Sequence, residues 1–195
     1  MNLGSQPKPG IQDIEDAKNA TKPRCLVPDG LQVEIVLGID PGTVVLGYGA
    51  LVLAADGPRF LTAGVVKANP RWPIARRLGH MLQGLEEVYV LTRPSFVAVE
   101  TAFTHRNPKT AIRLGEARGV AIASAYQFGA EVHEVSPSEA KKCVTGNGLA
   151  AKEQVAAVLP KLLRLAELDV PIDATDALAL AFAFIRRREL ARLTR

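Results

Sequence analysis

The residues best suited to chemistry in this chain are four carboxylates that stand at the ends of apolar segments. Asp40 closes the first such segment, in the string VLGIDPG, and Glu100 closes a second, in FVAVE. Asp173 and Asp176 open the last apolar segment, DATDALALAFAF. An acid that ends a buried segment is costly unless its charge is compensated. Four such acids brought together would repel one another, and a pair of divalent cations would offset that repulsion.

Converging carboxylates would supply the hard oxygen ligands that Mg²⁺ prefers, with Mn²⁺ able to substitute. A site that holds two such ions hydrolyses phosphodiesters, because one ion activates and aims a water while the other stabilises the leaving oxygen. Asp40 is the natural bridging ligand on a rigid strand, and Glu100 would reach in from a neighbouring strand. Asp173 and Asp176, three residues apart, share one face of a helix and could close the site from that side. Two Mg²⁺ ions per active site are therefore the expected cofactor.

Each acid also has a structural explanation. Asp173 and Asp176 would lie in a first helical turn, where capping and the helix dipole favour acids. Asp40 precedes Pro and Gly and could be a turn residue. Glu100 follows four apolar residues and is harder to explain in this way. The case for a metal site rests on the four acids together.

An alternation of strands and helices is expected to position these acids. Alternating apolar residues bounded by turn residues predict strands, and a 3.6-residue period predicts helices. The strands are expected at residues 33–40, 46–54, 59–67, 96–100 and 131–135. The helices are expected at about 74–91, 109–128, 150–165 and from 173 past 185, with a short capped helix after Ser136.

This order of elements predicts an α/β fold with one mixed five-stranded sheet and helices on both faces. The first three strands, joined by turns, should form an antiparallel meander, and the later strands, entered through helices, should run parallel to the first. If strands 33–40 and 96–100 are neighbours, Asp40 and Glu100 emerge at the same edge of the sheet. Strands about 4.8 Å apart would let two carboxylates share a pair of ions roughly 3.5–4 Å apart.

Length and composition bound the class of protein. The 195 residues, 48% hydrophobic and 23% charged, predict one domain with a substantial core. No run of 18 apolar residues occurs, so no membrane span is expected, and the N-terminus has no apolar signal segment. Cys25 and Cys143 lack metal-ligand spacing, which indicates reduced thiols in the cytoplasm. The net charge of +4 is compatible with a polyanionic partner.

The first part of the chain differs from the rest. Residues 1–31 are polar, contain Gly, Pro and Lys, and have no hydrophobic period. We predict a disordered N-terminal extension there, although a start codon assigned too early would look the same. The folded domain is expected to cover residues 32–195.

Some polar residues near the acids are candidates for contact with nucleic acid. Arg106 and Asn107 precede a helix start, where free amides also favour phosphate. The structural alternative for the basic run at 105–118, which includes Arg118, is a solvated helix face. Lys152 lies near the first turn of its helix, where a cation opposes the dipole unless an anion visits.

A stripe of small residues recurs every four positions in the helix expected at 109–128. Glycine inside a helix costs about 1 kcal/mol relative to alanine, so two glycines on one stripe indicate that another backbone packs there closely. The partner is either a helix of the same chain or the equivalent helix of a second subunit in a two-fold dimer. The stripe consists of Ala111, Gly115, Gly119 and Ala123.

Four strings of the sequence together resemble the RuvC family of Holliday-junction resolvases, which have a ribonuclease-H-like fold. They occur in the family's order and span about residues 37–184. LGEARGVA beside GIDPG is specific, whereas GIDPG alone would be weak. The strings are GIDPGTVVLGYG at 38–49, VETAFTHRNPKTAIRLGEARGVA at 99–121, AKKCVTGNGLAAKEQV at 140–155 and DATDALALA at 173–181.

The resemblance implies roles for individual residues. All four acids match the family's metal-binding acids, although some members carry His where Asp173 stands. Phe103 matches an aromatic residue that stacks on a base near the junction. Lys141 and Lys152 match two basic residues near the scissile phosphate.

The resemblance also implies an activity. It indicates a metal-dependent endodeoxyribonuclease that resolves Holliday junctions by paired symmetric nicks in homologous recombination and DNA repair. Such a protein would act as a homodimer in the cytoplasm, together with the branch-migration proteins RuvA and RuvB. Two alternatives stay open: an RNase-H-like nuclease that acts on RNA, and a non-catalytic module that binds nucleic acid through the basic segments alone.

Overall fold

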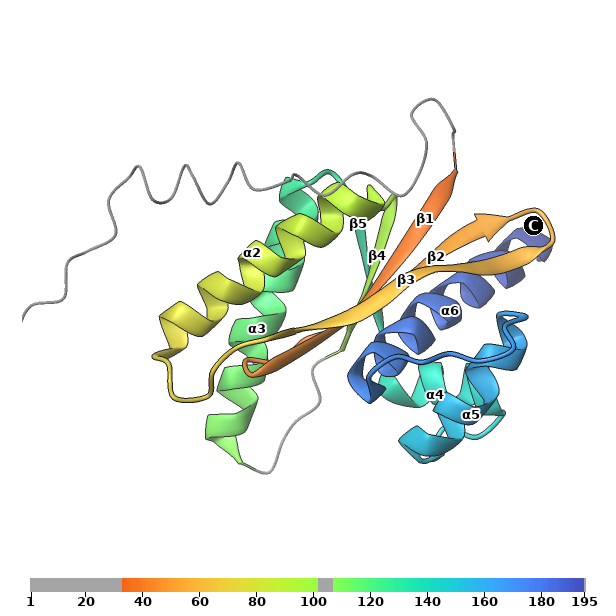
Figure 1. Ribbon diagram of the computed structural model, residues 1–195. Coiled ribbons are helices and arrows are strands. Elements are labelled where there is room, and N and C mark those ends of the chain that lie inside the picture. Colours follow the sequence, from red (N-terminus) through yellow and green to blue (C-terminus); the bar gives the residue numbers. More distant parts are fainter. Residues whose placement is uncertain (1–32, 102–106, 195) are drawn as a thin grey trace, which may run out of the picture.

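One mixed five-stranded sheet forms the centre of the fold (Figure 1). The computed structural model describes residues 33–101 and 107–194. The strand order is β3-β2-β1-β4-β5; β1 pairs antiparallel with β2, and β2 with β3, whereas β4 runs parallel to β1 and β5 parallel to β4. The predicted meander and the parallel strands after it are therefore confirmed. The strands are β1 (Glu34–Asp40), β2 (Val45–Ala54), β3 (Gly57–Lys67), β4 (Phe96–Glu100) and β5 (Glu131–Val135).

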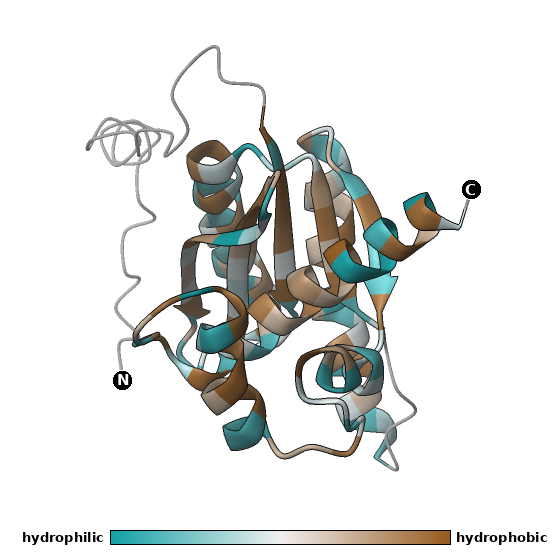
Figure 2. Cartoon of the chain, turned by 90° about the vertical axis from the view of Figure 1, so that its right-hand side faces the viewer, coloured by the Kyte–Doolittle hydropathy of each residue, from teal (hydrophilic) through white to brown (hydrophobic). Residues whose placement is uncertain are grey.

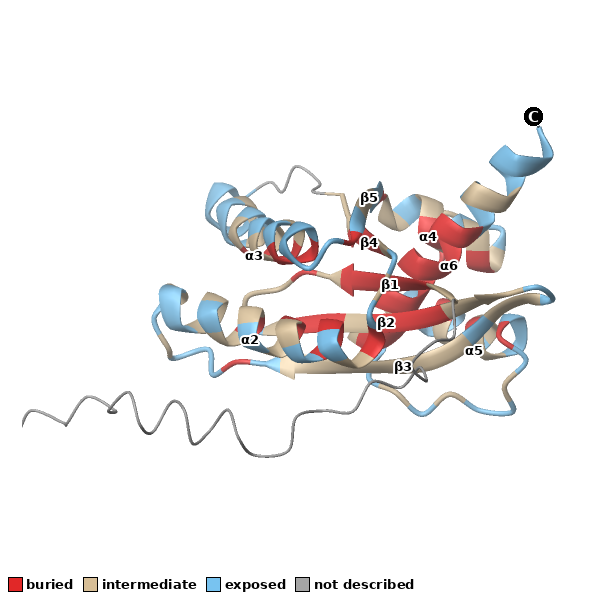
Figure 3. Cartoon of the chain, turned by 90° about the horizontal axis from the view of Figure 1, so that it is seen from above, coloured by how far each residue is buried: buried red, intermediate tan, exposed pale blue. Residues whose placement is uncertain are grey.

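Helices cover both faces of this sheet, as the sequence predicts (Figures 1 and 3). On one face lie α2 (Ile74–Thr92) and α3 (Pro108–Gln127). On the other lie α4 (Pro137–Thr145), α5 (Lys152–Leu162) and α6 (Ile172–Leu193). Along β1 the side chains alternate between two apolar clusters, because successive strand residues point to opposite faces. Ile35, Leu37 and Ile39 pack toward α2 and α3, whereas Val36 packs toward α6.

The helix expected at 150–165 is shorter than predicted. The segment before it forms a turn, in which the Asn147 side chain accepts a hydrogen bond from the Leu149 N–H and the Asn147 carbonyl accepts one from the Ala150 N–H. The helix therefore begins at Lys152 and ends at Leu162. Just beyond it, Arg164 has the left-handed φ of 57°, which no helix continues through.

The long helix α6 lies directly against β1 and β2. Figure 3 shows buried residues gathered on these two strands and along α6, and Figure 2 shows hydrophobic residues running along the strands. Glycines make this close approach feasible: a Cβ atom on Gly38 would lie 1.8 Å from the Ala177 carbonyl oxygen, and one on Gly47 would lie 2.1 Å from that of Asp173. Since Gly47 pairs with Asp40 across the β1–β2 ladder, the glycines bring the start of α6 to the end of β1.

The helices of the described segments include none that is long and apolar enough to cross a membrane. Even α6, whose first half is almost wholly buried, turns charged beyond Ile185.

Candidate active site

Two of the four acids lie side by side at one edge of the sheet. The parallel register of β1 and β4 pairs Gly38 with Ala98 and Ile39 with Val99, so the next pair is Asp40 and Glu100. By strand alternation, Asp40 shares the face of Gly38, which is the face that α6 covers. A hydrogen bond joins the Asp40 and Glu100 side chains.

The first turn of α6 brings the other two acids to the same place. Carboxylate oxygens of Asp40, Asp173 and Asp176 all lie within 4.8 Å of one another. Glu100 stands outside this trio, but it lines the same hollow of about 280 Å³ with Asp40 and Asp176. The structure therefore gathers all four predicted acids at one edge of the sheet, with three of them close enough to share a cation.

Electrostatic repulsion makes this cluster receptive to a cation. Burial, together with the negative charges of Glu100 and Asp176, raises the pKa of Asp40 from 3.8 to about 8. A hard cation fits the site, because oxygen is the only donor that these carboxylates offer and a positive charge would favour their ionised forms.

Lys152 lies at the mouth of this cluster, in the first position of α5. Its ammonium group forms an ion pair with Asp176. Burial alone would lower the pKa of Lys152, but its hydrogen bond with Asp176 and the charges of Asp176, Asp40 and Asp173 raise it. Lys141, from α4, lines the same hollow. Two lysines thus line the hollow that Asp40, Glu100 and Asp176 share.

Arg118 has a structural contact that its place in the basic run did not reveal. Its Nε–H donates to the carbonyl oxygen of Glu100 at 3.1 Å, and its Nη2 pairs with Glu134 at 2.5 Å. Its side chain is only 20% exposed, so it belongs neither to a solvated helix face nor to an open phosphate site. Arg118 instead links α3 to the ends of β4 and β5.

Asn107 is the N-cap of α3: its side-chain oxygen accepts a hydrogen bond from the Lys109 N–H at 3.0 Å. This contact satisfies one of the free amides at the helix start. Phe103 and Arg106, the other residues predicted to touch DNA in this loop, lie outside the described residues.

The small-residue stripe on α3 faces away from the other elements of the part of the chain that the structure describes. At Gly115 and Gly119 an added Cβ atom would meet nothing within 4 Å, and Ala123 is exposed while Ala111 is half-buried. Packing of these glycines against another helix of the same chain, the first alternative considered from the sequence, is therefore wrong for the described residues. The stripe lies on an open surface.

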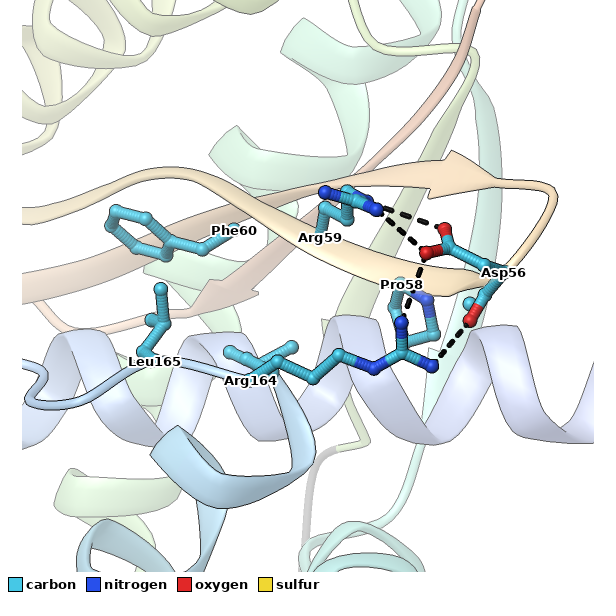
Figure 4. Close-up of a pocket in the computed structure, with 8 residues that line it drawn as sticks. Asp56, Pro58, Arg59, Phe60, Arg164 and Leu165 are labelled. Carbon is cyan, nitrogen blue, oxygen red and sulfur yellow. Dashed lines mark hydrogen bonds and ion pairs between the residues drawn. The ribbon is translucent and has the colours of Figure 1, made fainter.

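A second hollow, at the tip of the β2–β3 hairpin, has no comparable chemistry (Figure 4). Its acid, Asp56, accepts hydrogen bonds from Arg59 at 2.6 Å and from Arg164 at 2.9 Å. Two guanidinium groups thus neutralise one carboxylate. The hairpin tip also lies at the opposite end of β2 from Gly47, which pairs with Asp40.

The family model described as "Crossover junction endodeoxyribonuclease RuvC" matches residues 36–184. The chain belongs to the RuvC family. Its similarity to a crossover junction endodeoxyribonuclease RuvC of Chlorobaculum parvum is 42% identity over 153 residues, which is 78% of this chain and 82% of that protein. It is similar to the Thermus thermophilus RuvC structure at 34% identity and a TM-score of 0.72, covering 80% of this chain and 96% of the other. The T. thermophilus RuvC in complex with Holliday junction substrate gives 36% identity and the same TM-score and coverage.

Membership of the RuvC family confirms the resemblance seen in the sequence and the ribonuclease-H-like fold that it implied. The matched segment contains all four acids as well as Lys141 and Lys152. It begins two residues inside β1. The predicted disordered extension at 1–31 lies outside both the match and the described residues, so it stays a prediction.

Proposed function

We propose that this RuvC-family chain is a metal-dependent endodeoxyribonuclease that resolves Holliday junctions by paired symmetric nicks, in homologous recombination and DNA repair. The observation that carries the proposal is the carboxylate cluster, with oxygens of Asp40, Asp173 and Asp176 within 4.8 Å and Glu100 on the next strand. Relatives named crossover junction endodeoxyribonuclease support the activity, and a relative solved with Holliday junction substrate supports the choice of DNA.

The four acids would hold two Mg²⁺ ions, with Mn²⁺ able to substitute. When bound, these ions supply an activated water and stabilise the charge on the leaving oxygen. Asp40 is suited to bridge them, because it projects from the central strand between Glu100 and the α6 acids. The Lys152 ammonium, which pairs with Asp176, would also interact with a phosphate oxygen bound beside the acids.

The DNA would lie across the mouth of this hollow. Lys141 and Lys152 line it and would pair with phosphates beside the scissile bond. Arg106 and Asn107, at the start of α3, are proposed to contact the backbone as well. Phe103, from the same loop, is proposed to stack on a base at the junction centre, where such a contact is worth about 1–3 kcal/mol.

Symmetric nicks require two active sites related by a two-fold axis. We propose a homodimer that packs through Ala111, Gly115, Gly119 and Ala123 of α3. The open space over the two glycines supports the close approach of a second backbone. The protein is proposed to act in the cytoplasm on junctions that RuvA and RuvB move.

The test is cleavage of a mobile four-way DNA junction with Mg²⁺, with the cut sites mapped on every strand. We expect paired nicks at symmetric positions on two opposed strands, and Asp40→Asn should remove them. Asp56→Asn, which changes an ion-paired acid at the far end of β2, serves as the matched control and should cleave normally.

Other outcomes would point elsewhere. Cleavage that requires a 2′-OH would indicate an RNA nuclease. Junction binding without cleavage by the wild-type protein would indicate a non-catalytic module. Full Mg²⁺-dependent cleavage by Asp40→Asn would refute the assignment of the metal site.

A further inference from the structure

A cationic surface lies beside the carboxylate edge of the sheet, on the face opposite α6. No Asp or Glu occurs between Asp56 and Glu86 in the sequence. We call this surface the Trp72 patch, and it consists of Lys67 at the end of β3, Arg71 and Trp72 in the following loop, and Arg76 and Arg77 in the first turn of α2.

Contacts among its own side chains and backbone fix the geometry of the Trp72 patch. The Arg76 guanidinium lies over the Trp72 ring at 4.2 Å, and Trp72 in turn meets the edge of His80 at 5.6 Å between ring centres. The loop is shaped by Asn69, whose side chain accepts from the Arg71 N–H at 2.9 Å and whose carbonyl accepts from the Trp72 N–H at 3.0 Å. Asn69 therefore fixes the backbone at Arg71, and the Trp72 ring holds the Arg76 guanidinium without a carboxylate.

The patch arginines Arg71 and Arg76 have no ion-pair partner among the described residues, whereas Lys67 lines a hollow together with Glu87 of α2. Among the described residues, no carboxylate forms an ion pair with Lys67, Arg71 or Arg76, although most arginines elsewhere in the fold have one. The nearest acid along α2, Glu86, is ten residues beyond Arg76, or about 15 Å along the helix. Arginine in a first helical turn opposes the helix dipole, and this turn has no acid and no side-chain cap. An anion bound there would offset the arginine charges and would accept hydrogen bonds from the uncapped N–H groups of the first turn.

The patch is tied to the loop that follows Asp40. The Nη1 group of Arg77 donates to the Thr43 hydroxyl at 3.2 Å, and the Ala68 N–H donates to the Val44 carbonyl at 2.9 Å. Thr43 is three residues from Asp40, so their Cα atoms are at most about 11 Å apart. The Trp72 patch thus begins within a few nucleotides of any phosphate held at the acids. It lies on the α2 face of the sheet, whereas Lys141 and Lys152 lie on the α6 face.

We propose that the Trp72 patch binds backbone phosphates of the duplex arm next to the strand that is cut. The inference rests on the proposed junction cleavage and adds to it a second set of phosphate contacts, on the other side of the active site. Arg71 and Arg76 would each pair with one phosphate, and Trp72 would hold the Arg76 guanidinium in place by its stacking. Such contacts position the duplex without reading its sequence.

The test compares two double variants that lower the net charge equally. Arg71→Ala/Arg76→Ala removes two exposed arginines of the patch, and Arg186→Ala/Arg192→Ala removes two exposed arginines near the far end of α6. Affinity for a static four-way DNA junction is measured without divalent cation over a range of salt concentrations. The patch variant should bind at least severalfold more weakly near 0.1 M salt, and its slope of log K against log salt should fall by about 2. The control double variant should match the wild type.

Phosphate ethylation interference locates the contact. Ethyl groups on phosphates beside the cleavage position should weaken binding of the wild type but have no further effect on Arg71→Ala/Arg76→Ala. Equal losses in both double variants, or an unchanged salt slope in the patch variant, would overturn the proposal. Because binding is scored without metal, a wild type that binds junctions yet fails to cut them would count against the proposed function and not against the patch.

Discussion

Asp40 is the residue on which the electrostatics of the site depend. It ends the central strand, and burial together with the charges of Glu100 and Asp176 raises its pKa to about 8. Without a cation beside it, the raised pKa favours the protonated form of this carboxyl. Binding of a divalent cation would remove that proton, since the cation favours the ionised form.

This shift predicts a pH dependence of stability. A group whose folded-state pKa lies above its ordinary value of 3.8 stabilises the fold fully below that value, and the contribution is lost as the pH rises through about 8. In EDTA the wild type should therefore lose stability between roughly pH 4 and 8 relative to Asp40→Asn, which has no carboxyl to ionise. Urea denaturation in EDTA across this range is the measurement, and added Mg²⁺ should abolish the difference. Parallel pH profiles for the two proteins would contradict the prediction.

Arg118 affects the carboxylate cluster indirectly, because its hydrogen bond to the Glu100 carbonyl oxygen positions the backbone of that acid. Arg118→Ala should slow single-turnover junction cleavage by about tenfold, or about 1.4 kcal/mol, which is close to the lower end of the roughly 1.5–3 kcal/mol for a hydrogen bond to a charged group. Arg118→Lys should recover part of the rate through Glu134, although lysine lacks the second donor in a fixed plane. Arg113→Ala, on the same helix and paired with Glu116, is the control. An equal loss in both alanine variants would mean that Arg118 has no special part in positioning Glu100.

At the scale of the elements, the sheet could be predicted from local patterns. Strand ends are marked by Pro41-Gly42 and by Asp56-Gly57, and the apolar runs between them fix which strands are buried. The parallel pairing of β1 with β4 then follows from the intervening helix. Local patterns could not reveal that α6 packs against Gly38 and Gly47, since these contacts join residues more than a hundred positions apart. Local patterns also could not reveal the contacts of Arg118, because its partners Glu100 and Glu134 lie on two different strands.

The glycines under α6 give a prediction at this scale. Gly47→Ala would place a Cβ atom 2.1 Å from the Asp173 carbonyl oxygen, which is backbone and cannot turn aside. The helix start must then move away from Asp40, at a cost of at least about 1–3 kcal/mol in the free energy of unfolding. Mg²⁺ affinity, measured by calorimetry, should fall in the same variant.

The control for this substitution is Gly79→Ala in α2. Gly79 is exposed inside the helix, and an added Cβ atom would meet nothing within 4 Å. Because alanine is the better helix former, this variant should be more stable than the wild type by up to about 1 kcal/mol. A Gly47→Ala variant with wild-type stability and Mg²⁺ affinity would show that α6 can be displaced without disturbing the acids.

At the scale of the whole molecule, the carboxylate edge and the α3 stripe have to serve the same substrate. A four-way junction has near two-fold symmetry, so a two-fold dimer could present one carboxylate cluster to each of two opposed strands. Large apolar side chains accompany the open glycines on α3: Ile112 is 62% exposed and Tyr126 is 81% exposed. Exposed side chains of this size on one helix are typical of a surface that a partner covers.

Gly119→Leu tests this assembly without disturbing the monomer. The space beyond Gly119 is open, so leucine there should fold as well as the wild type but prevent a second α3 from approaching. Sedimentation should then find monomer, and cleavage should change from paired nicks to rare single nicks, because each active site acts alone. Gly79→Leu, a solvent-exposed glycine of α2 with equally open space, is the matched control and should remain dimeric. A stable dimer of Gly119→Leu would remove α3 from the interface, and paired nicking by a monomer would remove the need for a dimer altogether.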